Sequence, residues 1–510
     1  MSKKVLMGSL LLILSVAVLA SVVKKKPVLQ DRNANTFRKI ELINQVDQQN
    51  RYYERHLSRR TAVVDVPDAT ASKGKASASG DMLRRKRTVE TAIPIADYYG
   101  DKVVQVGNAM PLDKITGSTI ATSDYEYATA YFNRNIAMGS DGIVHAVWSD
   151  AGTPSNVVYY AKSTDKGETW STPEVINDGY YGYKPTIDVD PSDPTKIHVA
   201  YIGYMNSGET RTARYVKSED GGETWGASVL VAGSQVDTNN PDIVVDSQGN
   251  PHVAFDSYVD IFIRYNYSSD GGTTWMAEPE IVNTGFGEGT FGAAISLDND
   301  GNPHVLFGGG GGGDTWGDKD VYWNWRDMAS GEWQEIPPVQ LSTGTSGTPY
   351  PSMVFDSNGI GHCFYDAQGT TVARSVWYRQ YDPDVGWGDP VEFPTSVAGG
   401  YTMLAQAAID DNDNLYVGYF DGLGGGMNLE PSEGDFFVGT NVSGEWQYTN
   451  VSGNGPNVYE SHPNVARTVS SSDSLMHCLM GVGNAAPYNI VHEVGYPWPP
   501  NPKCGVNQLS

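Results

Sequence analysis

The chain has 510 residues, of which 39% are hydrophobic and 11% aromatic, so it can bury a large core and global disorder is excluded. Its formal net charge is −25, but the first 100 residues carry 18 basic and 9 acidic side chains, a net of +9. The remainder therefore carries a net charge of −34, which repels phosphate backbones and excludes duplex nucleic acid as a partner.

Residues 1–26 read as an export segment. Two lysines, Lys3 and Lys4, precede the uncharged run 5–23, and three further lysines follow it at positions 24–26. Small residues before Ser21 offer a cleavage site for a signal peptide, whereas the length of the run and the lysines after it suit a retained membrane anchor. Both alternatives place the bulk of the protein outside the cytoplasm, secreted or anchored at the cell surface, with membrane contact only through this segment.

The next two segments predict a connection rather than a folded domain. Residues 27–68 place apolar side chains at helical spacing among many charges, which indicates an amphipathic helical spacer. Residues 69–99 are small, polar and basic, which is typical of a flexible linker, and the basic run Arg84–Arg87 within it is a candidate protease site. Residues 496–510 form a C-terminal tail.

Between residues 100 and 495 one phrase recurs seven times, and this internal repetition decides the predicted fold. Each copy has an alternating strand, a turn with Asp, Asn or Gly, and a second strand that begins near a His. Successive copies of that position are 52 to 61 residues apart, and they hold His145, His198, His252, His304, His362, Tyr416 and His477. Because six equivalent His on separate strands cannot converge on one metal ion, we predict that they are structural.

Three copies continue into a turn of the pattern Ser-x-Asp-x-Gly-x-Thr-Trp, at residues 163–170, 218–225 and 268–275. In such a turn the Asp carboxylate accepts backbone N–H groups, Gly takes a positive φ and Trp packs down between strands. The pattern resembles the Asp-box (BNR) repeat of the sialidase-like β-propeller superfamily. The resemblance implies an all-β fold, a seven-bladed β-propeller of four-stranded blades, with one blade more than sialidases have.

Two further features concern closure of the ring and metal binding. The last copy supplies three strands, so we expect residues 102–106 to add its fourth strand and join the two ends of the ring. The segments 298–302 and 410–414 look like calcium loops, but they recur as the turn between first and second strands, so hairpin turns are favoured. No cofactor is expected, Ca²⁺ is only weakly supported, and no Cys/His spacing fits a zinc site.

A ligand site is expected at the end of the propeller where the innermost strands begin, because two sets of loops meet there. These loops and the adjoining strand ends are rich in aromatic and acidic residues, and flat rings with carboxylates suit stacking and hydrogen bonding to sugars. The candidate ligand-binding residues are Tyr181, Tyr183, Tyr204, Asp256, Tyr258, Tyr350, Asp366, Tyr401 and Asp421.

The enzymology of the family does not carry over directly. Sialidases use three arginines, a Tyr–Glu pair and an acid/base Asp, and this chain offers only Arg134, in a displaced Phe-Asn-Arg-Asn-Ile phrase, and Arg467 as counterparts. Some propeller polysaccharide lyases use a His or Tyr base with an Arg, and His462 with Arg134 could take those roles. If the protein is an enzyme, the candidate catalytic residues are Arg134, Asp150 and His462.

The sequence therefore favours a module that binds a glycan or a cell-surface protein through the loop face of the propeller. A glycan-active enzyme, either a sialidase-like glycoside hydrolase or a polysaccharide lyase, is the alternative. A structural subunit of a cell-surface assembly is the third possibility, and the oligomeric state is left open.

Overall fold

The structure is a computed structural model, and it describes residues 118–124, 128–129, 134–150, 156–178, 181–204, 211–232, 237–257, 260–286, 289–310, 319–342, 349–370, 374–393, 401–423, 433–442, 446–452, 460–470, 475–483 and 488–495. The chain divides into two units, residues 1–77 and 78–510, and every described residue belongs to the second. The predicted export segment, spacer, linker and C-terminal tail lie outside these ranges. Within them, no helix is long and apolar enough to cross a membrane.

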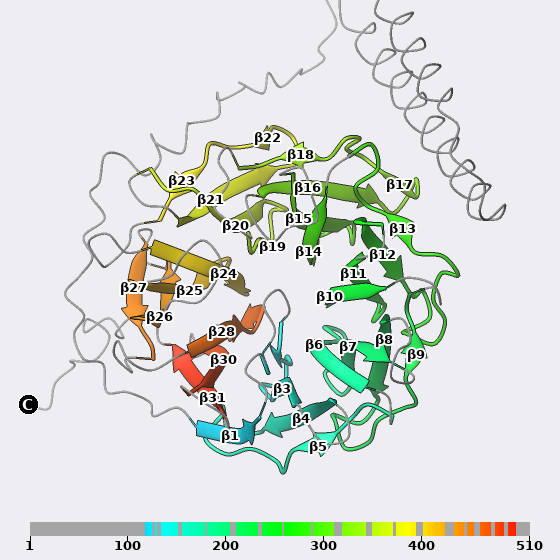
Figure 1. The fold of residues 1–510 in the computed structure, drawn as a ribbon, viewed down its shortest axis with the longest axis vertical. Coiled ribbons are helices and arrows are strands. Elements are labelled where there is room, and N and C mark those ends of the chain that lie inside the picture. The colour runs from blue at the N-terminus through cyan, green and yellow to red at the C-terminus, as the bar shows by residue number, and fades with distance from the viewer. Residues whose placement is uncertain are drawn as a thin grey trace, which may run out of the picture. The chain divides into compact units, whose positions relative to one another are not determined.

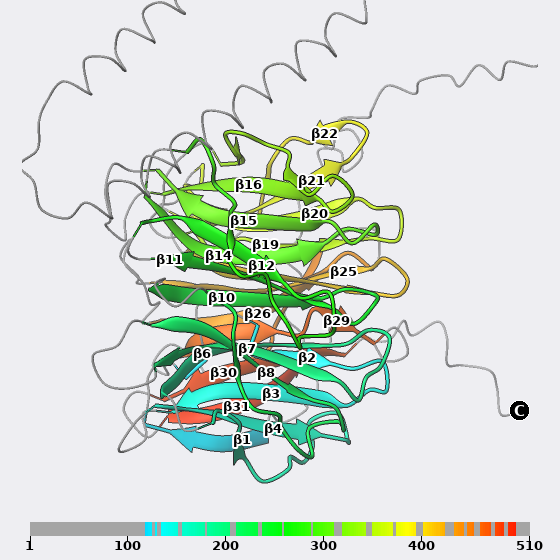
Figure 2. The same cartoon turned by 90° about the vertical axis from the view of Figure 1, so that its right-hand side faces the viewer.

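The described residues form seven antiparallel sheets arranged as the blades of a propeller, which confirms the predicted fold (Figures 1 and 2). In each blade the first strand lies innermost. Blade one comprises β2 (Ile136–Met138), β3 (Val144–Asp150), β4 (Val157–Ser163) and β5 (Glu174–Val175). Blade two comprises β6 (Tyr181–Val189), β7 (Ile197–Tyr204), β8 (Thr212–Ser218) and β9 (Val229–Leu230). Blade three comprises β10 (Thr238–Val245), β11 (Pro251–Ser257), β12 (Ile263–Tyr267) and β13 (Glu280–Ile281).

In blades four and five two short strands share the outermost position. Blade four comprises β14 (Thr290–Leu297), β15 (Pro303–Gly309) and β16 (Asp320–Asp327), with β17 (Glu332–Trp333) and β18 (Val339–Gln340) outside them. Blade five comprises β19 (Ser352–Phe355), β20 (Gly361–Ala367) and β21 (Ser375–Asp382), with β22 (Gly386–Trp387) and β23 (Val391–Glu392) outside them. Blade six comprises β24 (Tyr401–Asp410), β25 (Leu415–Leu423), β26 (Glu433–Thr440) and β27 (Gln447–Asn450), and β29 (Thr468–Val469) pairs with β24 in parallel.

Blade seven joins the two ends of the ring. It comprises β28 (Glu460–Val465), β30 (Met476–Val482), β31 (Tyr488–Gly495) and, outermost, β1 (Ser118–Ser123) from the N-terminal side of blade one. The expectation that the closing strand comes from before the first repeat is therefore met, but by Ser118–Ser123 rather than by residues 102–106, which lie outside the described ranges. The closing strand leaves β31 with a partner on its outer side.

The side chain at the repeated His position makes hydrogen bonds inside its own blade. The imidazole Nδ1 lies within hydrogen-bond distance of a hydroxyl on the neighbouring strand in four blades, at 2.6 to 2.7 Å, in the pairs His145–Tyr160, His198–Tyr215, His252–Tyr265 and His362–Tyr378. His304 accepts a hydrogen bond from the Trp323 indole instead, and His477 pairs with His492. All of these His are buried, which agrees with the predicted structural role.

The three Ser-x-Asp turns close in the way that their sequence predicts. In the first of them the Thr169 backbone N–H donates to Asp165 Oδ1 at 2.8 Å, and Gly167 has a φ of 91°. The Trp of the next turn reaches the preceding blade, where Trp225 packs edge-on against Tyr160 with ring centroids 4.9 Å apart. These turns therefore fasten neighbouring blades at the rim.

The two segments that look like calcium loops are turns between the first and second strands, as favoured. The Asn302 backbone N–H donates to Asp298 Oδ1 at 2.8 Å, and the Asn414 N–H donates to Asp410 Oδ1 at 2.9 Å. Each carboxylate thereby closes its own turn. In the described part of the chain, no group of three or more His, Cys, Asp or Glu side chains is placed to hold a metal ion.

Candidate functional site

The innermost strands place one side chain each around the propeller axis, at equivalent positions of the repeat. This axial ring consists of Asn135, Thr186, Asp242, Ala294, Ser352, Gln406 and Asn464. Most of its members accept a hydrogen bond from the innermost strand of the next blade. The donors are the backbone N–H groups of Ile295 to Asp242, Ala407 to Ser352, Val465 to Gln406 and Asn135 to Asn464, at 2.9 to 3.3 Å. The ring thus fixes neighbouring blades to one another around the axis.

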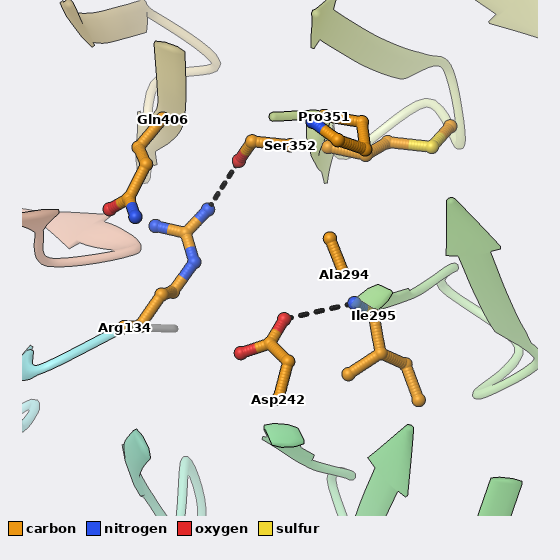
Figure 3. Close-up of a pocket in the computed structure, with 8 residues that line it drawn as sticks. Arg134, Asp242, Ala294, Ile295, Pro351, Ser352 and Gln406 are labelled. Atoms are coloured by element: carbon orange, nitrogen blue, oxygen red, sulfur yellow. Dashed lines mark hydrogen bonds between the residues drawn. The ribbon is translucent and has the colours of Figure 1, made fainter. Parts of the chain in front are cut away.

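Arg134 fills the centre of this ring (Figure 3). Its guanidinium donates to the carbonyls of Val465 and Ala407, at 3.2 and 2.7 Å, and to the Ser352 hydroxyl at 2.9 Å. A second arginine, Arg467, donates to two backbone carbonyls of blades three and four. Two arginines therefore tie together the innermost strands of five blades.

A small cavity remains beside Ala294, the one ring position whose side chain has no polar group. It holds about 10 Å³, roughly the space of one water molecule, and its walls include Arg134, Asp242 and Ser352 (Figure 3). Arg134 fills the axis at this level. It therefore forms the floor for any ligand that approaches from the end where the innermost strands begin.

The charges at this floor compensate one another. Burial and the nearby Arg467 together lower the pKa of Arg134 to about 9, although Asp242 and Asp188 act in the opposite direction. Burial also raises the pKa of Asp242, while the two arginines favour its charged form. Two arginines and two aspartates thus interact at this floor, where Arg134 and Asp242 are buried and Arg467 and Asp188 are half-buried.

Above this floor, blades two and three contribute a polar group of side chains. Lys184 Nζ donates to Asn239 Oδ1 and Asn240 Oδ1, both at 2.8 Å, and the Asn240 amide lies 3.4 Å from Asp256 Oδ2. Lys184 and Asn240 occupy irregularities of β6 and β10 and have positive φ values of 50° and 40°. Burial lowers the pKa of Lys184 and raises that of Asp256, and each charge partly offsets the effect on the other.

Blades four to six contribute an apolar group at the same end. Phe291, Tyr350, Met403, Leu404 and Phe420 form one cluster of buried side chains. Behind it, Asp366 Oδ2 accepts from the Leu404 backbone N–H at 3.0 Å and from Arg374 at 2.8 Å, and the Arg374 guanidinium lies over the Tyr350 ring. We call the polar and apolar groups together the axial mouth. Three of its side chains keep some exposure, which is 9% for Lys184 and 7% each for Phe291 and Leu404.

Two of the three aspartates predicted to bind ligand at this end, Asp256 and Asp366, are engaged inside the fold. Asp256 and Asp366 occupy the same repeat position, four residues after the His, and both are 1% exposed. Asp366 accepts a hydrogen bond from the Leu404 backbone N–H of the next blade. Ser149, at the same repeat position of blade one, accepts one from the Lys184 backbone N–H of blade two. In each aspartate Oδ1 is buried without a hydrogen-bond partner in the described structure.

The other predicted residues are distributed as follows. Asp150 ends β3 and accepts hydrogen bonds from Ser123 and Asp124, where the chain leaves the closing strand. Tyr183 is buried and lies within hydrogen-bond distance of Arg211, Tyr181 is half-buried at the start of β6, and Asp421 is buried near the end of β25. The strands contain Tyr204, Tyr401 and His462, but their side chains, and all of Tyr258, lie outside the described part.

Sequence reasoning missed Lys184, Arg374 and Gln406. A signal for Lys184 existed, because the residue before the Pro of the innermost strand recurs as Lys184, Asn240, Tyr350 and His462. This recurrence marks the point where the strand irregularity turns a side chain toward the axial mouth. Arg374 and Gln406 carry no comparable local signal.

Comparisons with known proteins support the fold alone. No family model and no curated protein matches the sequence. Among solved structures, an ulvan lyase described as a new family of polysaccharide lyase aligns with a TM-score of 0.50 at 12% identity, over 74% of this chain and 96% of that one. An α-L-arabinanase of Penicillium chrysogenum aligns with a TM-score of 0.45 at 16% identity, over 66% and 98% of the two chains. A Hadza microbial sialidase aligns with a TM-score of 0.41 at 14% identity, over 60% and 66%.

Proposed function

We propose that this protein is exported, either secreted or anchored by residues 1–26, and binds a glycan at the axial mouth. One observation carries the proposal: an ammonium and two amides of blades two and three lie around the same axis as an aromatic and aliphatic cluster of blades four to six. A sugar ring has a polar edge and an apolar face, so it can use both groups at once. Arg134 lies on the same axis, at the centre of the axial ring.

Binding rather than catalysis is proposed because the polar groups at the mouth serve the fold. The acceptors of Lys184 are two buried amides, and Asp366 is held by Arg374 and a backbone N–H. Arg134, one of the three catalytic candidates in the sequence, has three acceptors within the ring. The test below distinguishes glycan binding from two other possibilities, a cell-surface protein as the ligand and a structural role in a surface assembly.

A glycan-active enzyme is the second candidate, and Asp256 is the residue that favours it. Its pKa is raised by burial, one carboxylate oxygen has no partner in the described structure, and Lys184 lies within reach of the same group of amides. A carboxyl group whose pKa is shifted toward neutrality is suited to proton transfer. The shared fold with an ulvan lyase, named as a polysaccharide lyase, is compatible with this candidate.

The test is to apply the purified full-length chain to an array of neutral, sialylated and uronate-containing glycans, with both retention and released products measured. The matched variants are Lys184→Met at the mouth and Lys162→Met at the rim, where the ammonium pairs with Glu223. We expect retention without products, reduced at least tenfold by K184M and unchanged by K162M. Product release that Asp256→Asn abolishes would establish the enzyme instead, and silence on every glycan would point to a protein ligand or a structural role.

A further inference from the structure

A second concave surface lies at the opposite end of the propeller from the axial mouth, between the Ser-x-Asp turns of blades two and three. This rim groove has a volume of about 420 Å³, within the range of roughly 300–1,000 Å³ that is usual for ligand sites. Its lining includes Tyr215, Lys217, Glu219, Trp225, Val229 and Thr273. The corresponding positions between blades one and two differ from this lining in two ways.

The first difference concerns a salt bridge between turns. In blade one, Lys162 Nζ reaches the next turn, where it pairs with the Glu223 carboxylate and donates to the Gly221 carbonyl. The equivalent ammonium in blade two, that of Lys217, also donates to a carbonyl of the next turn, but Thr273 stands where the first pair of turns has Glu223. Lys217 pairs instead with Glu219 of its own blade, at 2.7 Å. No carboxylate of the next turn therefore crosses this groove.

The second difference concerns the floor of the groove. Glu174 and Glu280, at one position of the outermost strand, accept the indole N–H of Trp225 and Trp333 of the following blade, at 3.2 and 3.0 Å. Val229 occupies this position in blade two, and the indole nitrogen of Trp275 is buried without a hydrogen-bond partner in the described structure.

The same combination of a valine and an unpartnered indole occurs in blade four. There Val339 occupies the position of the glutamate, and the indole nitrogen of Trp387 is likewise buried without a partner in the described structure. At the rim groove this substitution coincides with the exchange of glutamate for Thr273 in the next turn. Glu174 and Glu223, the two carboxylates that make these contacts between blades one and two, therefore both have uncharged counterparts at the rim groove, Val229 and Thr273.

The chemistry of the lining suits a sugar. The Trp225 indole offers an aromatic surface for a pyranose ring, and the Lys217 ammonium offers a donor. The Thr273 hydroxyl, which donates to the Asp270 carbonyl, and the Glu219 carboxylate offer acceptors. A charged ligand is disfavoured, since the cation of Lys217 is already paired and the body of the chain is strongly acidic.

We propose that the rim groove is a second glycan-binding site, which takes a neutral saccharide segment of one or two rings independently of the axial mouth.

The experiment is saturation-transfer NMR on the full-length chain with mannotriose, cellotriose and N-acetyllactosamine as neutral probes and sialyllactose as the acidic one. We expect transfer to at least one neutral probe. Thr273→Glu and Val229→Glu restore the carboxylates of the neighbouring groove, and each should weaken that binding at least tenfold. Leu230→Glu is the control, because it adds the same charge at the adjacent side chain, which is 39% exposed and does not line the groove.

Folding of the variants is checked by thermal unfolding. Thr273 is exposed, so T273E keeps the native fold, and V229E offers the Trp275 indole the acceptor that it lacks. The proposal is overturned if no neutral probe binds, or if binding survives both substitutions. Binding that Lys184→Met abolishes and T273E leaves intact would also overturn it, because the sugar would then occupy the axial mouth and support the proposed function alone.

Discussion

The axial ring and the three Ser-x-Asp turns at the rim hold blades together in different ways. At the rim, a Ser-x-Asp turn closes through groups four residues apart, such as the Thr169 N–H and the Asp165 carboxylate. At the axis, Arg134 reaches Val465, which is 331 residues away along the chain. The turn contacts at the rim recur from blade to blade, whereas the contacts of Arg134 at the axis are buried and come from one blade alone. Repetition therefore specifies the blades, and the single long-range contacts specify how the ring closes.

Lowering the pH should affect the buried histidines of the blade interior before the turns at the rim. We expect it to have the largest effect on the stability of the protein. Burial lowers the pKa of His145, His198 and His492 to about 3, so the native state stays neutral where the unfolded chain takes up protons. The contribution of these histidines to the free energy of unfolding is therefore fully present above pH 6.5 and is lost as the pH falls from 6.5 to 3. Each His contributes a slope of about 1.4 kcal/mol per pH unit. Urea unfolding at a series of pH values measures this slope, and His198→Gln should flatten it.

The rim turns should respond in a lower pH window. Hydrogen bonds from Thr169, Thr224 and Thr274 lower the pKa of Asp165, Asp220 and Asp270 to about 2. Their contribution is complete above the ordinary Asp pKa, near 3.8, and is lost as the pH falls through 2. NMR titration of the three carboxylates tests this order, which would be contradicted if they titrated together with the histidines.

Removal of the axial arginine should be the most damaging single substitution. Arg134→Met leaves two carbonyls and a hydroxyl without their donor and leaves buried Asp242 with less counter-charge, so we expect a loss of about 3–5 kcal/mol in the free energy of unfolding. Arg134→Lys should not restore it, because one ammonium cannot reach acceptors on three blades. Chemical denaturation measures both variants. A loss below about 1 kcal/mol would show that the axial contacts are dispensable.

A single rim turn should matter less. The buried Ser218 hydroxyl accepts from the Gly222 N–H at 2.8 Å and donates to Asp220, and Ser218→Ala removes both bonds. We expect a cost of about 1–2 kcal/mol, measured in the same denaturation series. Ser247→Ala, in an exposed turn between first and second strands, is the matched control and should be close to neutral. An effect of S218A as large as that of R134M would abolish the distinction between rim and axis.

What the sequence predicted follows the same division. The seven blades, the buried histidines and the Ser-x-Asp turns follow from local patterns that recur, and all are confirmed. A closing strand from before the first repeat was expected at residues 102–106, but the strand is Ser118–Ser123. Its alternation of apolar and polar residues is too weak to mark it in the sequence. Arg134 could be recognised as unusual, yet its partners Ser352, Ala407 and Val465 could not, because no local pattern joins positions so far apart.

The position of the closing strand has a mechanical consequence. Since β1 is the outermost strand of blade seven, the chain that precedes it joins the propeller at the perimeter and not at the axis. Force applied to the chain at Ser118 therefore acts on β1, which pairs with β31 of blade seven and is also bonded through Ser118 to the Ser-x-Asp turn of blade one. The strand that completes the ring is thus also its point of attachment, and a pull strong enough to detach it would open blade seven first.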